Sequence, residues 1–449
     1  MKKAGHGKAP RKSRGARKKN YIKEDSRDVS EEAEQSVVED ENASCAELVK
    51  AFKCSTISSY KAASELSTTI ENLPEELLIN IFIRLLAKQL AKMRAVSKSW
   101  NALLSESSFV KSHLHHSIHS SELMLAAMNE DVCSCNSAQC TVHTNPSPEL
   151  SPTSPVNPQS NRIKVIGAVT GLVCLSSYNY SVISIKNFSL SAVSRLPPFL
   201  LPDSTTSQIF LRFGFDPQTD DYKVVKLTGI MSMKKLSSAV GRMQFPYRMK
   251  KWLKVEVYSM RKGSWELITA SVPSRIKMLI DSDLLCADGH DGHLHWISWC
   301  SRGGKTYLDT IVSFDLSSHT FREIPFPDAS TLNHHDYMSR IGVLSGKLCV
   351  ILEGDGSAFE VWVMDESWVK RHVFSLSSLS EVYPFGFTSQ TGEFLVGHGG
   401  DLVLWDLCAN KGKYFDKFCC GKRHHPYKIL EYVNSLVWVT PDKTELEGA

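Results

Sequence analysis

The sequence lacks the features that mark membrane-spanning and disulfide-bonded proteins. It has no uninterrupted apolar run of the roughly 18 residues that a membrane helix needs, and no apolar segment follows its basic start. Its twelve cysteines form no regular framework, and several lie inside apolar runs, where a reduced thiol packs as a small hydrophobic group. We therefore expect a soluble intracellular protein in a reducing compartment, in the nucleus, the cytoplasm or both.

Motifs for catalysis and for strong nucleic-acid binding are also missing. There is no glycine-rich phosphate loop and no nucleophilic serine turn. The formal net charge is only +4 over 449 residues, which gives the folded part of the chain little attraction for nucleic acid. The sequence therefore predicts a protein that is not an enzyme, has no catalytic residue and needs no metal or other cofactor.

Four clusters of titratable residues could carry chemistry, but each has a simpler interpretation. The cysteine cluster could hold zinc, yet its spacing fits no standard zinc class, so free surface thiols are favoured. The first histidine cluster indicates exposed imidazoles at a helix end. The second could bind a metal or act in acid–base chemistry, or could simply line a loop. The aspartates are interpreted as a turn. These clusters are Cys133, Cys135, Cys140 and His143; His113, His115, His116 and His119; His290, Asp291, His293 and His295; and Asp216, Asp220 and Asp221.

Residues 1–69 are predicted to be a disordered tail and linker. Residues 1–23 carry ten Lys or Arg and no acid, whereas residues 24–41 carry nine Asp or Glu against one Arg. A segment with so much charge and so few large apolar groups cannot bury a core. The basic run at 11–19 is either a nuclear import signal, a weak phosphate-binding arm or a solvated tail.

Residues 70–119 contain more apolar positions at helical spacing than one small core can bury. Pro74 suits the first position of a helix, and Glu75 and Glu76 follow where the helix dipole favours anions. Three further short amphipathic pieces follow this helix. Pieces this short cannot bury all their apolar faces on one another, so we expect part of this surface to bind a partner chain. A helical subdomain without a partner is the alternative.

A Ser- and Pro-rich linker follows at 120–162, although the helix could continue over 121–128. Residues 163–440 then consist of short β-rich runs separated by Gly, Asp and Pro turns. An apolar run led by Gly or Asn recurs five times, starting at Gly171, Gly292, Gly346, Gly392 and Asn434. We expect each run to be an inner strand followed by two outer strands.

Hairpins with an aromatic residue on each arm accompany these runs and set a repeat length. The pairs are Tyr258 with Trp265, Phe314 with Phe321, Trp362 with Trp368, and Trp405 with Tyr414; their first members lie 56, 48 and 43 residues apart. That period is the size of one propeller blade. The ends of this region should meet in one blade and close a ring. An open β-sandwich is the alternative, and residues 441–449 are a tail.

The helical stretch resembles an F-box. The resemblance is carried by Leu-Pro-Glu-Glu-Leu-Leu at 73–78, by Arg-Ala-Val-Ser-Lys-Ser-Trp at 94–100, and by Phe109 followed by His113. It implies a trihelical fold that binds the Skp-type adaptor of a cullin-RING ubiquitin ligase. The chain has Leu86 where the family usually has proline. Residues implied to face the adaptor are Leu73, Pro74, Leu77, Leu78, Ile81 and Leu85, with Val96 and Trp100 shared between helix packing and adaptor contact.

The β-rich region resembles the plant F-box-associated interaction domain, which is related to kelch-type propellers. The matching segments are 213–226, 255–259, 292–296, 314–316, 321–325 and 359–364. The resemblance implies a plant origin. The fold class predicted for the whole chain is α+β multidomain, with a small trihelical F-box at 70–119 and an all-β, propeller-like domain of about six blades at 163–440.

These patterns and resemblances predict a substrate-recognition subunit of an SCF-type cullin-RING E3 ubiquitin ligase. The F-box would bind the adaptor and the ligase scaffold, and the β domain would present an unidentified target protein on its loops, because loops vary while the sheets hold them rigid. The long segments 229–252 and 330–338 are candidate contact loops, but no single residue is assigned to the target. A nuclear nucleic-acid-associated scaffold that uses the basic tail, and a metal-dependent enzyme, are the alternatives.

Overall fold

A computed structural model describes the chain in two compact units, residues 1–73 and 74–449, and only Leu73 of the first unit is described. The predicted tails at 1–69 and 441–449 lie outside the described residues. No helix within the described ranges is long and apolar enough to cross a membrane. The described residues are 73–119, 124–129, 140–144, 151–152, 163–177, 179–201, 207–233, 247–276, 278–280, 291–302, 305–327, 339–353, 358–376, 382–388, 392–398, 401–409, 411–414 and 427–439.

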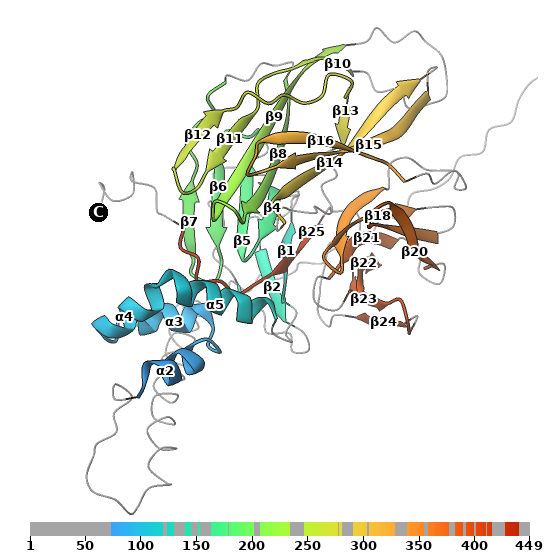
Figure 1. Cartoon of the computed structure of the whole chain (residues 1–449). Coiled ribbons are helices and arrows are strands. Elements are labelled where there is room, and N and C mark those ends of the chain that lie inside the picture. The colour runs from blue at the N-terminus through green and yellow to red at the C-terminus, as the bar shows by residue number, and fades with distance from the viewer. Residues whose placement is uncertain are drawn as a thin grey trace, which may run out of the picture. The chain divides into compact units, whose positions relative to one another are not determined.

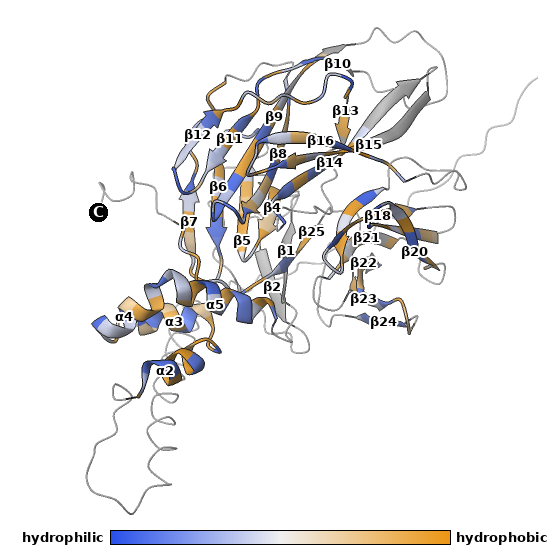
Figure 2. Ribbon diagram, viewed as in Figure 1, coloured by the Kyte–Doolittle hydropathy of each residue, from blue (hydrophilic) through white to orange (hydrophobic). Residues whose placement is uncertain are grey.

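The helical region contains four described helices, where the family resemblance implied three. They are α2 (Glu75–Phe82), α3 (Ala87–Met93), α4 (Lys98–Ser105) and α5 (Ser107–Ile118). They correspond to the four short amphipathic pieces of the sequence, and Figure 2 shows hydrophilic and hydrophobic residues side by side along them. α5 ends at Ile118, and residues 124–129 form strand β1, where the sequence had allowed a continuing helix.

The described strands form six antiparallel sheets (Figure 1). Five of them consist of strands that follow one another along the chain. The first contains β4 (Ile163–Val169), β5 (Leu172–Ser177), β6 (Ile183–Asn187) and β7 (Ala192–Arg195); the second β8 (Ser207–Asp216), β9 (Asp221–Met233), β10 (Tyr247–Trp252), β11 (Glu256–Ser259) and β12 (Ser264–Leu267). The third contains β13 (Met278–Ile280), β14 (His293–Arg302), β15 (Lys305–Asp315) and β16 (Thr320–Pro325); the fourth β17 (Arg340–Leu344), β18 (Lys347–Glu353), β19 (Ala358–Met364) and β20 (Trp368–Ser375); the fifth β21 (Val382–Phe387), β22 (Phe394–His398), β23 (Asp401–Asp406) and β24 (Lys411–Tyr414).

The sixth sheet joins the two ends of the domain. β25 (Tyr427–Tyr432) pairs with β1 (Met124–Asn129), which is followed by β2 (Cys140–Thr144) and β3 (Ser151–Pro152). The ends therefore meet in one sheet, as predicted, but through other strands. The predicted linker at 120–162 contains β1 to β3, and the run that starts at Asn434 forms no strand. Pairing between segments about 300 residues apart leaves no local pattern in the sequence.

The recurring glycines mark one turn in each repeat. Gly171, Gly292, Gly346 and Gly392 all have positive φ, a conformation that glycine adopts without steric cost, and each lies just before a strand. These strands, β5, β14, β18 and β22, are the second strands of their sheets, because β4, β13, β17 and β21 precede them. The predicted inner strand is therefore the second strand of its sheet.

Two of the four predicted aromatic pairs lie directly opposite each other. Tyr258 faces Trp265 and Phe314 faces Phe321, with ring centroids 5.5 and 4.8 Å apart. In the fifth sheet, however, Trp405 is opposite Gly412 rather than Tyr414. A Cβ on Gly412 would stand 2.8 Å from the Trp405 ring, so the indole occupies the space that a larger residue would fill.

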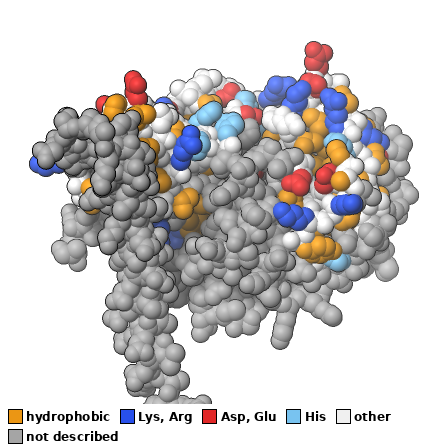
Figure 3. Space-filling view, turned by 90° about the horizontal axis from the view of Figure 1, so that it is seen from below, with side chains coloured by type: hydrophobic (Ala, Val, Ile, Leu, Met, Phe, Trp, Pro, Cys, Tyr) orange, Lys and Arg blue, Asp and Glu red, His pale blue; other side chains and the backbone are white. Residues whose placement is uncertain are grey.

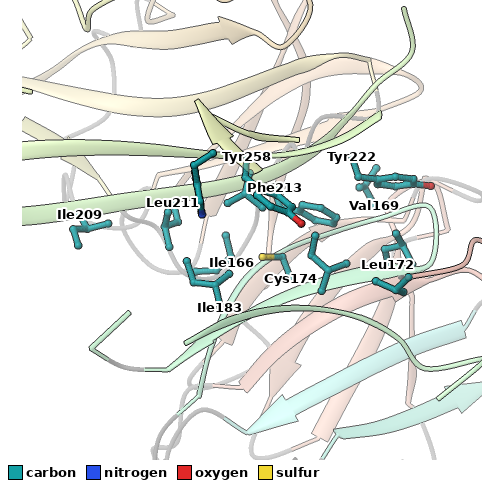
Figure 4. Packing of buried hydrophobic residues seen from close by; sticks show 14 residues of the cluster. Ile166, Val169, Leu172, Cys174, Ile183, Ile209, Leu211, Phe213, Tyr222 and Tyr258 are labelled. Atoms are coloured by element: carbon teal, nitrogen blue, oxygen red, sulfur yellow. The ribbon is translucent and has the colours of Figure 1, made fainter. Parts of the chain in front are cut away.

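Neighbouring sheets pack through continuous apolar layers. Figure 4 shows Ile166, Cys174 and Ile183 of the first sheet packing with Leu211 and Phe213 of the second. Similar clusters join the second sheet to the third, the third to the fourth and the fourth to the fifth, and a smaller one joins β4 and β5 to β25. This side-by-side packing of small sheets, with the chain ends joined in one of them, is the arrangement of a β-propeller.

Candidate functional site

Helix α2 places two neighbouring leucines in different surroundings. Pro74 is the N-cap of the helix, one position earlier than predicted, and its carbonyl accepts the amide hydrogens of Leu77 and Leu78 at 3.0 and 3.2 Å. Successive residues lie about 100° apart around a helix, so the two leucines point in clearly different directions. Leu78 is 8% exposed, whereas Leu77 is 50% exposed.

The helical region has its own complete core. The Trp100 ring meets the Phe82 ring edge to face, with centroids 5.0 Å apart, and joins α4 to α2. The hydroxyl oxygen of Ser97 accepts the amide hydrogen of Trp100 at 3.1 Å and caps α4. Leu90 and Leu104 are fully buried beside them. Trp100 is therefore needed for packing, whatever else it contacts.

Two polar side chains, the buried His113 and the half-buried Arg94, connect segments of the helical region. The His113 Nε2 atom lies 2.9 Å from the Leu85 carbonyl oxygen, and an Arg94 nitrogen donates to the Leu104 carbonyl at 2.7 Å. Burial lowers the pKa of His113, with a further lowering from the charge of His116 and an opposing effect of the Leu85 hydrogen bond. His113 is a neutral packing residue here. His115 and His119, with ring centroids 4.2 Å apart, are exposed at the helix end as predicted.

The predicted partner-facing residues divide into exposed and buried groups. Leu77 and Val96 are largely exposed, Val96 by 64%, whereas Leu78 and Trp100 belong to the chain's own core. Leu86, which the predicted set omitted, is 51% exposed and lies beyond the end of α2, at the N-cap of α3. Figure 3 shows hydrophobic side chains among charged ones on the face seen from below. Of the remaining predicted residues, Pro74 is exposed and Leu73, Ile81 and Leu85 are half-buried.

Among the described residues, a hydrogen bond and an ion pair link this helical region to the propeller. The amide of Ala87, the first residue of α3, donates to the Asn434 side-chain oxygen at 2.9 Å. The Lys111 Nζ atom on α5 lies 2.9 Å from an Asp220 carboxylate oxygen in the turn between β8 and β9. The Asn434 side chain caps α3, whose own N-cap residue, Leu86, has no side-chain oxygen that could accept a backbone amide hydrogen.

The predicted turn at 216–221 is confirmed. The carboxylate of Asp216 accepts hydrogen bonds from Gln218 N and Thr219 Oγ1 and pairs with Lys223 Nζ at 2.7 Å. Burial acts to raise the pKa of Asp216, but these hydrogen bonds and the Lys223 charge hold it below its ordinary value. Asp221 accepts from Ser259 Oγ and Arg261 N, which joins β9 to β11. These carboxylates therefore stabilise the turn and its connection to β11.

The other clusters bring no metal set together among the described residues. His293 and His295 lie on the same face of β14 with ring centroids 6.3 Å apart, and His293 Nε2 is 3.7 Å from an Asp315 oxygen. Cys133, Cys135 and His290 lie outside the described residues. Cys140 and His143 lie on β2, in a part of the chain for which side chains are not described.

The chain thus combines a small helical domain that has exposed apolar residues with a β-propeller. Family comparisons agree with this division. Residues 70–115 match the F-box-like family, and residues 122–414 match the F-box associated beta propeller domain. The chain belongs to the plant F-box proteins with a C-terminal F-box-associated domain, which are proteins of the substrate-receptor type.

Individual relatives support this membership. The F-box protein CPR1 of Arabidopsis thaliana is 32% identical over 366 residues, which cover 76% of this chain and 83% of that protein. The F-box protein At4g22390 of the same plant is 28% identical over 356 residues, which cover 74% and 83%. A chain in a crystal structure of a nidogen/laminin complex covers 69% of this chain and 98% of its own length at a TM-score of 0.37 and 11% identity, which is too low to bear on function.

Proposed function

We propose that this protein is the substrate-recognition subunit of an SCF-type cullin-RING E3 ubiquitin ligase. The F-box binds a Skp-type adaptor, and the propeller binds a target protein. The observation that carries the proposal is that the F-box core is complete, with Leu78, Phe82 and Trp100 packed inside, while Leu77 and Val96 remain exposed. Leu77 lies on α2 and Val96 in the turn after α3, and exposed apolar side chains on or beside short helices are typical of a surface that binds another protein.

The adaptor surface consists of the exposed members of the predicted set. Leu77 and Val96 make direct contact, and Pro74, Leu73, Ile81 and Leu85 contribute the parts of their side chains that the core leaves accessible. Leu86 extends this surface where the family usually has proline. Leu78 and Trp100 act through packing, because they hold the helices that carry the contact residues.

The protein contributes position rather than chemistry to ubiquitin transfer. It supplies no catalytic residue and no cofactor; it raises the concentration of a target near the ubiquitin-charged enzyme of the ligase. The gain from such tethering depends on the distance and geometry between the two binding surfaces.

Co-purification with a purified Skp-type adaptor tests this proposal. Leu77→Asp places a charge where the adaptor would bury an apolar side chain, so we expect adaptor binding to weaken at least about tenfold. Leu267→Asp, at an exposed leucine at the end of β12 in the propeller, is the matched control and should bind as the unchanged protein does. Circular dichroism checks that both variants remain folded, as exposed substitutions normally do.

Two results would contradict the proposal. One is an unchanged chain that does not bind the adaptor at micromolar concentrations, and the other is equal binding by both variants.

A nuclear location is part of the same proposal, because the basic run at 11–19 fits an import signal. A fluorescent fusion should lose nuclear accumulation, though not adaptor binding, when the basic residues of that run are replaced by alanine.

A further inference from the structure

One edge of the second sheet carries an unusual concentration of positive charge. Residues 231–254 contain seven Lys or Arg and no Asp or Glu. Within the described residues of this stretch, Lys250, Lys251 and Lys254 are all exposed. The candidate contact loop predicted at 229–252 covers most of this stretch. The structure places its two ends in a hairpin, in which the end of β9 pairs with β10.

A β-bulge explains why two consecutive lysines are both exposed. Met249 pairs with Met231 and Lys251 with Ile230, so Lys250 is an additional residue in β10 without a partner of its own. In a regular strand, neighbouring side chains point to opposite faces. A bulge interrupts that alternation and redirects a side chain. Lys250 and Lys251 therefore both reach solvent, with Lys254 three residues further along the chain.

The lysines are held on a rigid part of the fold. The Trp252 indole nitrogen donates to the Ile276 carbonyl oxygen at 2.9 Å, and its ring lies 5.9 Å from the Phe210 ring. Trp252 packs against the apolar layer between the second and third sheets. The packing of Trp252 therefore holds the backbone beside Lys250 and Lys251 in place, which reduces the conformational entropy lost when a partner binds.

The hairpin lies at the end of β9 that is remote from the F-box contact. β9 starts at Asp221, next to the turn whose Asp220 meets Lys111, and runs over its whole length to Met233, where β10 joins it. Figure 1 shows β10 at the far end of β9. A partner bound to this hairpin would leave the F-box side of the second sheet uncovered.

We propose that Lys250, Lys251 and Lys254 form a docking surface for an acidic segment of the target protein. The inference rests on the proposed function and names the chemistry of its target. An acidic peptide is favoured over nucleic acid because the formal net charge of the whole chain is only +4, which gives it little general attraction for a phosphate backbone. A short run of carboxylates in the target would complement the positive charge of these three lysines.

Binding of a fluorescein-labelled poly-glutamate peptide to the full-length protein tests the proposal by fluorescence anisotropy. Replacing the three lysines together by glutamate (K250E, K251E and K254E) should weaken binding about tenfold or more, since each exposed ion pair contributes a few-fold. The matched control carries the same change in charge at exposed residues elsewhere: Arg195→Glu on β7, with Lys411→Glu and Lys413→Glu on β24. It should retain most of the affinity. Binding should also weaken as salt is raised, because salt screens surface charges.

Three outcomes would overturn the proposal. The first is no peptide binding even at low salt, and the second is an equal loss of peptide affinity in both triple variants. The third is a DNA duplex that binds the unchanged chain more tightly than the peptide does and no longer binds the K250E, K251E and K254E variant. Adaptor co-purification is measured on the same proteins. Loss of peptide binding with intact adaptor binding supports the docking surface, whereas an unchanged chain that binds peptide but no adaptor contradicts the proposed function alone.

Discussion

At the scale of single residues, adjacent leucines have separate tasks. Leu78 belongs to the core with Phe82 and Trp100, and Leu77 remains half exposed one position earlier. The sequence could predict that both belong to one apolar stripe, because helical spacing is a local property. It could not predict which of them the chain's own core would use, since that depends on how α4 packs on α2. Hence the predicted adaptor set mixed packing residues with exposed ones.

His113 makes the F-box sensitive to pH. Its Nε2 atom is hydrogen-bonded to the Leu85 carbonyl, so a neutral ring donates there, and Nδ1 has no hydrogen-bond partner among the described residues. A protonated ring would bury a second N–H and a charge without an acceptor, which is the physical reason that burial lowers the pKa of His113.

We predict that the F-box loses stability as the pH falls below about 6.5, the ordinary pKa of histidine. The folded state has the lower pKa, so the unfolded state binds the proton more readily; the stabilisation is fully present above the unfolded pKa and is lost as the pH falls towards the folded one. Hydrogen exchange of α5 at several pH values measures this. His113→Gln, which can still donate to Leu85, should flatten the dependence, whereas His398→Gln on β22 should leave it unchanged. Equal pH profiles for the unchanged chain and His113→Gln would contradict this assignment.

At the scale of elements, the sequence predicted what is local and repeated. The four short helices follow from apolar spacing, and the repeated strands follow from glycine turns and aromatic hairpins such as that of Phe314 and Phe321. It missed β1 to β3, because Ser- and Pro-rich composition outweighed short strands whose partner, β25, lies at the other end of the domain. Long-range pairing of this kind has no signature in a single window of sequence.

The segment 433–439 is the clearest case of an element that local pattern misassigned. Its apolar alternation predicted a strand, but it runs outside the sheets and is fixed by side chains. The fully buried Asn187 side chain donates to the carbonyls of Ser435 and Val437, both at 2.9 Å. The hydroxyls of Ser189 and Tyr432 are also hydrogen-bonded to each other. These hydrogen bonds therefore hold the segment 433–439 against the first sheet.

Gly171 tests how closely this segment packs. A Cβ at this position would stand 2.5 Å from the Cβ of Ser435 and closer still to the Val433 carbonyl oxygen, and the backbone φ is +82°. We predict that Gly171→Ala destabilises the protein by about 3 kcal/mol or more, from steric overlap added to backbone strain. Urea denaturation monitored by tryptophan fluorescence measures the change.

Gly346→Ala is the matched control for this prediction. Gly346 has a similar φ of +74° in the corresponding turn of the fourth sheet, but nothing lies within 4 Å of a Cβ there. It should cost only about 1–2 kcal/mol, the strain of a left-handed conformation. If the two variants lost equal free energy of unfolding, the segment 433–439 would not pack closely against the Gly171 turn in solution.

At the scale of the whole molecule, the two ends of the propeller meet beside the F-box. The chain leaves α5 at His119 and enters β1 at Met124, and β1 pairs with β25 before the chain continues to Asn434, which caps α3. The strand that closes the ring and the residue that holds the F-box are therefore parts of one short stretch. Closure of the propeller and attachment of the F-box should depend on each other.

Truncation separates these contributions. A chain ending at residue 440 should melt as the full-length protein does. A chain ending at 432 keeps β25 but loses the Asn434 cap and the Asn187 hydrogen bonds, and should melt a few degrees lower. A chain ending at 426 also loses β25, and should melt about 10 °C or more lower because the buried Ile429, Leu430 and Tyr432 are removed and β1 loses its partner.

Differential scanning calorimetry measures the melting temperatures of all three chains. If β25 closes the ring, limited proteolysis of the shortest chain should cut first within β1 or β2; equal melting of the chains ending at 426 and 440 would show that the ring is held without it.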